Sequence, residues 1–301
     1  MQALPAGVTV ALATPLRDDG GLDEEALGRL LTRVLDAGVV GISPLGSTGE
    51  GARQATAARR QVIGAVRGLI PAGMPIVAGL PVTTVESALD ELPAMAEAGA
   101  DAALVAPPTY YPASDSDLEM LYTTLADRSP IPLVIYHIPP LTTVQISPAA
   151  VGRLAQHPRI IGIKDSSREL EFLQAVIYAC EGAEFNVMTG SDSMLLASLL
   201  VGAHGTIAAS ANLVPALSVR LFNAVRDGAL DSARDIQREL FLIIQACRRG
   251  APPAGWKAAL EIVGVCSARL VSPASRLPDE LYSAVRADLE RLLPQDVVAG
   301  G

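Results

Sequence analysis

Residues 160–167 read Ile160-Ile161-Gly162-Ile163-Lys164-Asp165-Ser166-Ser167. Apolar or small residues lead into a lysine and a polar turn follows, which is typical of a buried strand whose end opens into a pocket. A buried ammonium group is costly unless it is paired or loses its proton. A neutral lysine is a nucleophile, and its natural target is a carbonyl carbon. We therefore expect Lys164 to be reactive; the structural alternative is a lysine that pairs with Asp165 or reaches solvent.

Similar apolar runs recur along the chain and alternate with helical patterns. The strand candidates are Val8–Leu16, Val39–Leu45, Pro75–Leu80, Ala100–Pro107, Pro132–Ile138, Ile160–Asp165, Phe185–Thr189 and Gly205–Ala209. The helical stretches include Asp23–Ala37, Ala55–Ile70, Val85–Ala98, Asp117–Arg128, Pro148–Gln156, Leu170–Cys180, Met194–Val201 and Pro215–Asp227. Continuously apolar strands are typical of parallel sheets buried on both faces. Eight strand–helix units predict an α/β fold, a (β/α)8 TIM barrel. The alternative, an open doubly wound sheet, lacks its G-x-G-x-x-G fingerprint.

The strand pattern stops after Gly228. Three further helices are predicted at Leu230–Arg249, Pro253–Cys266 and Leu277–Leu293. We expect residues 1–228 to form the barrel and residues 229–301 to form a C-terminal helical extension packed on it, within the same structural unit.

Composition narrows the class of protein. Half of the 301 residues are hydrophobic, yet no apolar run approaches the roughly 18 residues that a membrane span needs. The formal net charge of −9 and the lack of a basic cluster argue against nucleic-acid or membrane partners. The N-terminus has no signal-peptide pattern, and three cysteines without C-x-x-C spacing suggest reduced thiols, so we expect a cytoplasmic protein. The three histidines show no metal-binding spacing, and no G-x-S-x-G elbow occurs.

Other strand ends carry polar residues. The turn Gly46-Ser47-Thr48-Gly49-Glu50 offers free backbone N–H groups and two hydroxyls, which suit a carboxylate, although such a turn is also a common structural loop. Tyr110 follows a further strand and is equally consistent with packing. Tyr136 ends another strand, and a tyrosine in such an apolar run is more commonly a core residue. Asp192, in Thr189-Gly190-Ser191-Asp192, either caps the next helix or binds substrate hydroxyls; the sequence alone favours the cap. A barrel would bring all these strand ends to one mouth.

Together these motifs resemble the dihydrodipicolinate synthase / N-acetylneuraminate lyase family. The resemblance rests on Gly46–Glu50, Tyr110, Tyr136 with Pro139, Gly162-Ile163-Lys164 and Gly190-Ser191-Asp192, and spans nearly the whole chain. It implies a (β/α)8 barrel with helical extension, often a homotetramer built from two dimers. It also implies a class I aldolase, a carbon–carbon lyase that activates pyruvate or another 2-oxo acid as a lysine Schiff base and needs no cofactor or metal.

The resemblance also implies roles for individual residues. Lys164 matches the Schiff-base lysine and Tyr136 the proton-shuttling tyrosine. Ser47 and Thr48 match the pair that binds the carboxylate of the 2-oxo acid and links the tyrosines. Tyr110 matches a tyrosine that crosses the dimer interface to complete a proton relay in the synthases. Gly190 and Ile207 match positions in the pocket wall.

Departures from the family pattern bear on the substrate. Leu141 stands where the lysine-biosynthesis synthases carry an arginine for the second substrate's carboxylate, which disfavours 4-hydroxy-tetrahydrodipicolinate (dihydrodipicolinate) synthesis. His137 replaces the usual asparagine. An aspartate like Asp192 contacts sugar hydroxyls in sialic-acid lyases. We therefore expect cleavage of a 2-oxo-3-deoxy (sugar) acid to pyruvate and an aldehyde. Aldolases for 2-oxo-3-deoxygluconate or 4-hydroxy-2-oxoglutarate, a dehydratase using the same iminium, and a non-catalytic 2-oxo-acid-binding protein remain open.

Overall fold

The computed structural model describes residues 4–298, so residues 1–3, which contribute to the signal-peptide expectation, lie outside it. Eight strands are all paired in parallel, in the order β2-β1-β8-β7-β6-β5-β4-β3. They are β1 Gly7–Ala11, β2 Gly41–Ser43, β3 Val77–Pro81, β4 Ala102–Ala106, β5 Leu133–His137, β6 Ile160–Asp165, β7 Asn186–Thr189 and β8 Gly205–Ala208. A parallel bridge between Ile42 and Ile76 joins the two ends of this order, so the sheet closes as a TIM barrel.

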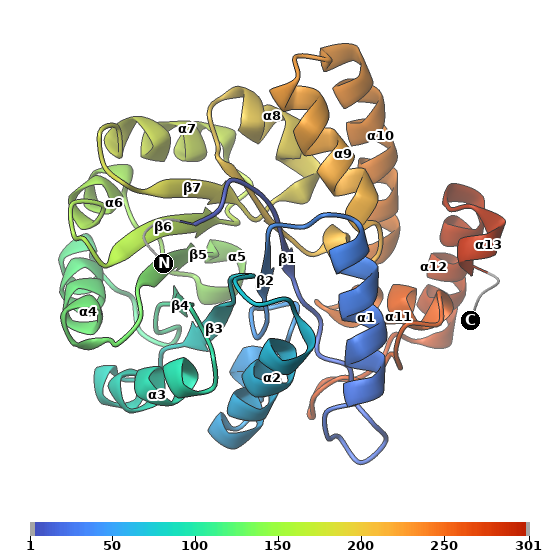
Figure 1. Ribbon diagram of the computed structural model, residues 1–301, viewed down its shortest axis with the longest axis horizontal. Helices are drawn as coiled ribbons and strands as arrows, with labels where there is room; N and C mark the ends of the chain where they lie inside the picture. The colour runs from blue at the N-terminus through green and yellow to red at the C-terminus, as the bar shows by residue number, and fades with distance from the viewer. Residues whose placement is uncertain (1–3, 299–301) are drawn as a thin grey trace.

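Helices surround the strands, as Figure 1 shows. The barrel helices are α1 Glu24–Asp36, α2 Thr56–Leu69, α3 Val85–Glu97, α4 Asp115–Arg128, α6 Pro148–Leu154, α7 Leu170–Ala179, α8 Leu195–Leu200 and α9 Pro215–Arg226. Asp23 and Ser147 cap α1 and α6 by accepting hydrogen bonds from Ala26 N and Ala150 N, as residues of these types at helix starts should. The predicted barrel is therefore confirmed, and the open doubly wound sheet is excluded.

Some short elements were not predicted. They are α5 Pro139–Thr142 and the 3₁₀ turns η1 Gly51–Arg53, η2 Asp192–Met194 and η3 Ser210–Asn212. The apolar run Val8–Leu16 is strand only as far as Ala11. Beyond it, Ala13 N donates to Asn212 Oδ1 at 2.9 Å rather than to a neighbouring strand, so the chain leaves the ladder.

The C-terminal helices are α10 Leu230–Cys247, α11 Ala254–Ile262, α12 Asp279–Leu292 and α13 Gln295–Val298. Helix α10 packs along α9 and α8, and α12 packs against α10 and α11 (Figure 1). Among residues 4–298, none of the helices combines the length and the apolarity that crossing a bilayer requires.

The barrel interior is filled by its own apolar cluster, separate from the layer between strands and helices. Its members include Leu4, Val77, Leu104, Val134, Ile161 and Met188, with Tyr136 and Ile207. A register irregularity between β5 and β6 pairs Leu133 with Ile160 but Val134 with Gly162, so Ile161 has no partner of its own. As a result Tyr136 pairs with Lys164, and both side chains border the cavity described below.

Candidate active site

A cavity of about 320 Å³ lies at the carboxyl ends of the strands, where TIM barrels carry their active sites. Almost every residue that the sequence singled out lines it: Ser47, Thr48, Tyr136, Leu141, Lys164, Gly190, Asp192 and Ile207. A second cavity of about 410 Å³ adjoins it and shares Ser47, Tyr136 and Leu141. The barrel therefore gathers side chains from strands far apart in sequence into one mouth.

Lys164 is buried, with 3 % of its surface exposed. Its Nζ lies 4.5 Å from the centre of the Tyr136 ring. Within the part of the chain that the structure describes, this Nζ makes no hydrogen bond and no ion pair. Gly190 leaves room for the lysine, because a Cβ at that position would lie 2.8 Å from Lys164 Cε. The amine therefore faces the cavity beside the Tyr136 ring, where it is accessible to the carbonyl carbon of a ligand.

Asp165 does not pair with Lys164. Consecutive residues of a strand point to opposite faces, and Asp165 faces away from the cavity. Its Oδ1 lies 2.7 Å from His137 Nδ1, and both side chains are buried. Ser167 donates to the same carboxylate through its N and its Oγ, both at 3.0 Å. The carboxylate thus ties β5, β6 and the following turn together behind the wall that holds Tyr136 and Lys164.

The tyrosine hydroxyl meets the predicted carboxylate-binding turn. Tyr136 OH lies 3.0 Å from Ser47 Oγ, which joins β5 to the turn after β2. Thr14 Oγ1 donates to Gly49 O at 2.8 Å, and Gln54 Nε2 donates to the same oxygen at 2.8 Å. Thr48 is 8 % exposed and borders the cavity. The turn is thus held from behind while its hydroxyls face the cavity.

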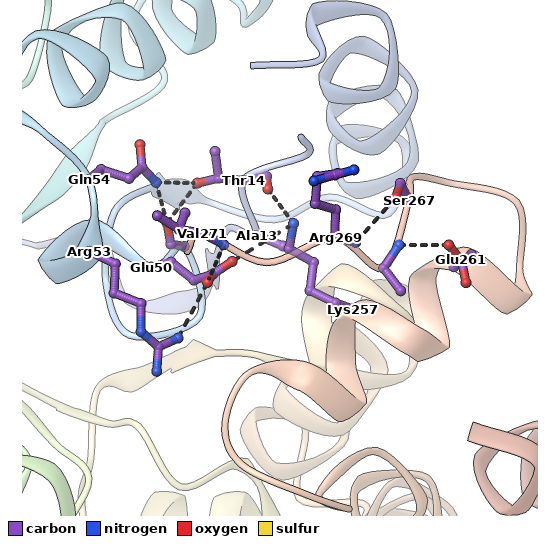
Figure 2. Close-up of polar contacts among 12 residues, drawn as sticks. Ala13, Thr14, Glu50, Arg53, Gln54, Lys257, Glu261, Ser267, Arg269 and Val271 are labelled. Carbon is purple, nitrogen blue, oxygen red and sulfur yellow. Dashed lines mark hydrogen bonds and ion pairs between the residues drawn. The ribbon is translucent and has the colours of Figure 1, made fainter. Parts of the chain in front are cut away.

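Glu50 closes this turn in the left-handed conformation, with φ of 56°. Its Oε2 accepts from Val271 N at 3.0 Å and from Arg53 Nη1 at 3.3 Å. Lys257 of α11 points at Glu50 from the C-terminal extension (Figure 2), with its Nζ 3.9 Å from Oε1 and donating to Thr14 O at 2.5 Å. Burial raises the pKa of the Glu50 carboxyl and lowers that of the Lys257 ammonium. This buried pair links the extension to the turn, and no pattern in the sequence indicated it.

Asp192 does not cap a helix, so that expectation is wrong. Helix α8 begins after Met194 and has no side-chain cap. The Asp192 carboxylate is 2 % exposed; its Oδ2 accepts from Ser210 N at 2.9 Å and its Oδ1 lies 3.6 Å from Arg248 Nη2. It borders the cavity with these contacts already made.

Tyr110 lies outside both cavities and is 87 % exposed, in an edge-to-face pair with Tyr111. A side chain that completes a neighbouring subunit's site would be exposed in a single chain. Leu141 sits on α5 at the mouth, 51 % exposed. The lining residues that sequence reasoning missed include Arg168, Arg248 and Trp256. No group of three or more metal-ligating side chains that could hold an ion occurs within residues 4–298.

Comparison with known proteins agrees with this architecture. Residues 4–292 match the dihydrodipicolinate synthetase family. The 4-hydroxy-tetrahydrodipicolinate synthase of Methanoculleus marisnigri is 34% identical over 95% of this chain and 98% of its own length. An uncharacterised DapA-like lyase of Halobacterium salinarum is 32% identical over 95% of this chain and 93% of its own.

Solved structures superpose over nearly the whole chain. YagE of E. coli, a prophage protein of the dihydrodipicolinic acid synthase family in complex with pyruvate, has a TM-score of 0.91 at 30% identity and covers 96% of this chain and 99% of its own. The chloride-inhibited dihydrodipicolinate synthase of Acinetobacter baumannii, also complexed with pyruvate, has a TM-score of 0.92 at 27% identity, covering 96% and 99%. The chain therefore belongs to the dihydrodipicolinate synthetase family and is one of its class I lyase or aldolase enzymes.

Proposed function

We propose that this enzyme reversibly cleaves a 2-oxo-3-deoxy (sugar) acid to pyruvate and an aldehyde through a Schiff base on Lys164. The observation that carries the proposal is the unpaired, buried Nζ of Lys164 beside the ring of Tyr136. Pyruvate in the crystals of two related proteins supports the choice of 2-oxo acid.

The chemistry follows from the contacts. Nζ attacks C2 of the 2-oxo acid, and loss of one water leaves an iminium. The iminium accepts the electrons of the C3–C4 bond when that bond breaks, while the C4 hydroxyl gives up its proton and becomes the aldehyde. The resulting enamine takes a proton at C3, and water hydrolyses the iminium to release pyruvate and regenerate the amine. Tyr136 carries protons in these steps, since its OH lies 3.0 Å from Ser47 Oγ and can exchange protons along that bond.

The remaining side chains bind the substrate and form the wall of the cavity. Ser47 and Thr48 hold the carboxylate of the 2-oxo acid, and Gly190 and Ile207 form the wall beside the lysine. Tyr110 completes the relay from a neighbouring subunit in a dimer or dimer of dimers; its exposure supports that role. The C-terminal extension, as far as residue 298, belongs to the same structural unit as the barrel; Arg248 and Trp256 line the cavity and Lys257 contacts Glu50. We place the enzyme in the cytoplasm, consistent with three free, buried cysteines.

Trapping the adduct tests the core of the proposal. The chain contains only two lysines, Lys164 and Lys257. Incubation with pyruvate and borohydride, followed by peptide mass spectrometry, should place one reduced adduct on the Lys164 peptide. Lys164→Ala should abolish it, and the Lys257 peptide serves as the internal control. An unmodified Lys164 peptide in the wild-type enzyme would refute the Schiff-base mechanism.

Synthesis of 4-hydroxy-tetrahydrodipicolinate is the second candidate, because several relatives carry that name. Leu141 argues against it, since an apolar side chain at the mouth cannot bind a second substrate's carboxylate. Scoring pyruvate release from 2-oxo-3-deoxy acids, alongside condensation of pyruvate with aspartate semialdehyde, separates the two. A dehydratase would instead form a dehydrated acid without releasing pyruvate, and a non-catalytic binder would form the adduct without turnover.

A further inference from the structure

The active-site cavity contains more positive charge than one carboxylate can balance. Its lining holds Lys164, Arg168 and Arg248, against a single acidic side chain, Asp192. When Lys164 has become an iminium, three positive groups face one carboxylate, which leaves an excess of two positive charges. A 2-oxo acid with one carboxylate neutralises only half of that excess.

Arg168 lies three residues after the end of β6 and lines the cavity. Its backbone is in the left-handed region, with φ of 69°, a conformation that residues other than glycine adopt uncommonly. No hydrogen bond or ion pair involving its guanidinium is found among residues 4–298. All five N–H donors of this side chain are therefore free for a ligand.

Arg248 reaches the same cavity from the end of α10. Its side chain is 25% exposed, and its only charged contact in the described chain is Asp192 Oδ1, 3.6 Å away and too long for a hydrogen bond. Burial lowers the pKa of Arg248, while the negative charge of Asp192 opposes that fall. Arg168 and Arg248 line the same cavity of about 320 Å³, so one anionic group bound there is within reach of both guanidinium groups.

The arginines and the carboxylate-binding turn come from different elements. Ser47 and Thr48 follow β2, Arg168 follows β6, and Arg248 ends α10. Since the turn already offers two hydroxyls to one carboxylate, Arg168 and Arg248 are available to a second anionic group. On one side of the mouth, the uncharged Leu141 stands where the synthases carry an arginine. On another side, Arg168 and Arg248 provide two positive charges.

We propose that Arg168 and Arg248 form a subsite for a second anionic group, a carboxylate or a phosphate, on the aldehyde-derived half of the substrate, so that the natural substrate is a dianionic 2-oxo acid. This inference rests on the proposed function for the identity of the first half. Arginine suits the task because its planar donors match carboxylate and phosphate oxygens.

Binding of two ligands of nearly equal shape tests the subsite. 2-Oxoglutarate and 2-oxovalerate differ only in a distal carboxylate or methyl group. Calorimetric titration of the wild-type enzyme should favour 2-oxoglutarate by about 10- to 100-fold, the range of a charged hydrogen bond. Arg168→Gln should reduce that preference to within about threefold, since a neutral amide forfeits the charged contact. Arg248→Lys should lower the preference for 2-oxoglutarate less, because lysine keeps the positive charge but lacks the paired N–H donors of arginine.

Arg234→Gln is the matched control, since Arg234 lies on the exposed face of α10 and, among residues 4–298, pairs only with Asp231. Arg168→Gln is the decisive variant because no described residue depends on its side chain for a partner. The melting temperature of Arg248→Lys shows whether the new lysine still balances the charge of Asp192, because loss of that contact would lower it. The pair 2-oxo-3-deoxy-6-phosphogluconate and 2-oxo-3-deoxygluconate repeats the comparison for phosphate, and the pair with the larger arginine-dependent preference identifies the anion.

Two results would overturn the subsite. One is a wild-type enzyme that shows no preference for the dianion in either pair. The other is loss of the borohydride-trapped pyruvate adduct in Arg168→Gln, which would mean that the arginine binds the first carboxylate. Failure of the proposed function looks different: the wild-type enzyme would form no pyruvate adduct, while an arginine-dependent preference for the dianion would persist and still support the subsite.

Discussion

Replacing Lys257 with methionine tests whether the buried pair with Glu50 stabilises the turn beside the active site. Methionine is similar in size and apolar, so packing of α11 is kept. The change removes the donor to Thr14 O and leaves the carboxylate of Glu50, which is 3 % exposed, with only Val271 N and Arg53 as partners. Removing one member of a buried ion pair costs about 3–5 kcal/mol, because the other charge stays buried. We expect a loss of that size in the free energy of unfolding at pH 8.

The loss should depend on pH with a defined sign. Burial already raises the pKa of Glu50 above its ordinary value, and the positive charge of Lys257 opposes that rise. Without Lys257 the pKa rises further, so the folded state binds a proton more tightly than the unfolded chain. Stability then falls as pH rises from the unfolded pKa through the folded one. The deficit of Lys257→Met should therefore be smaller at pH 5 than at pH 8.

Urea unfolding at fixed protein concentration measures these differences. Glu50→Gln/Lys257→Met should recover most of the stability that Lys257→Met loses, because the orphaned charge is gone. Arg234→Met, on the exposed face of α10, is the control for losing a cation and should stay within about 0.5 kcal/mol of the wild type. Strictly additive losses in the double variant, or a deficit that is the same at both pH values, would refute the coupling.

Three further predictions concern the site. Gly190→Ala should reduce adduct trapping with little loss of fold, since its Cβ would lie 2.0 Å from Ser166 Oγ and 2.8 Å from Lys164 Cε and would displace both side chains; an intact adduct yield contradicts this. Tyr136→Phe should lower kcat by about 100- to 10,000-fold while pyruvate still binds; a change confined to KM would remove Tyr136 from proton transfer. Asp165→Ala should destabilise by about 1–3 kcal/mol in urea unfolding, because it leaves His137 Nδ1 and Ser167 N without their partner; a neutral effect would show that water replaces the carboxylate.

The alternation of apolar runs and helical patterns along the sequence predicted the barrel. A strand of a parallel sheet is buried on both faces, which requires a continuous apolar run. The strand Ile160–Asp165 has the predicted ends. Strand alternation alone could also have excluded a Lys164–Asp165 pair, since neighbours in a strand face opposite sides. By contrast, the unpaired Ile161, which brings Tyr136 and Lys164 into register, depends on how two strands meet and leaves no local signal.

The sequence alone could not assign Arg168 and Arg248 to the site. They lie eighty residues apart in sequence, and Arg248 enters the cavity only because α10 packs along α9 and α8. Asp192 lies between a strand and a helix, where a helix cap is usual. A 3₁₀ turn separates it from the helix, and Arg248 approaches its carboxylate, so the carboxylate has other partners. Long-range packing, rather than local propensity, decides what these side chains do.

Lys164 and Lys257 are another case in which tertiary contacts, rather than residue type, decide the role of a side chain. Both are buried and both lie close to the carboxylate-binding turn, so burial alone does not separate their roles. Lys257 donates to Thr14 O and faces Glu50, so its amine is already engaged and connects the extension to the turn. Lys164 has an aromatic ring beside it, a glycine opposite, and no acceptor within the described chain. Because its amine faces the cavity and is not engaged by an acceptor of the described chain, Lys164 is the lysine available to a carbonyl.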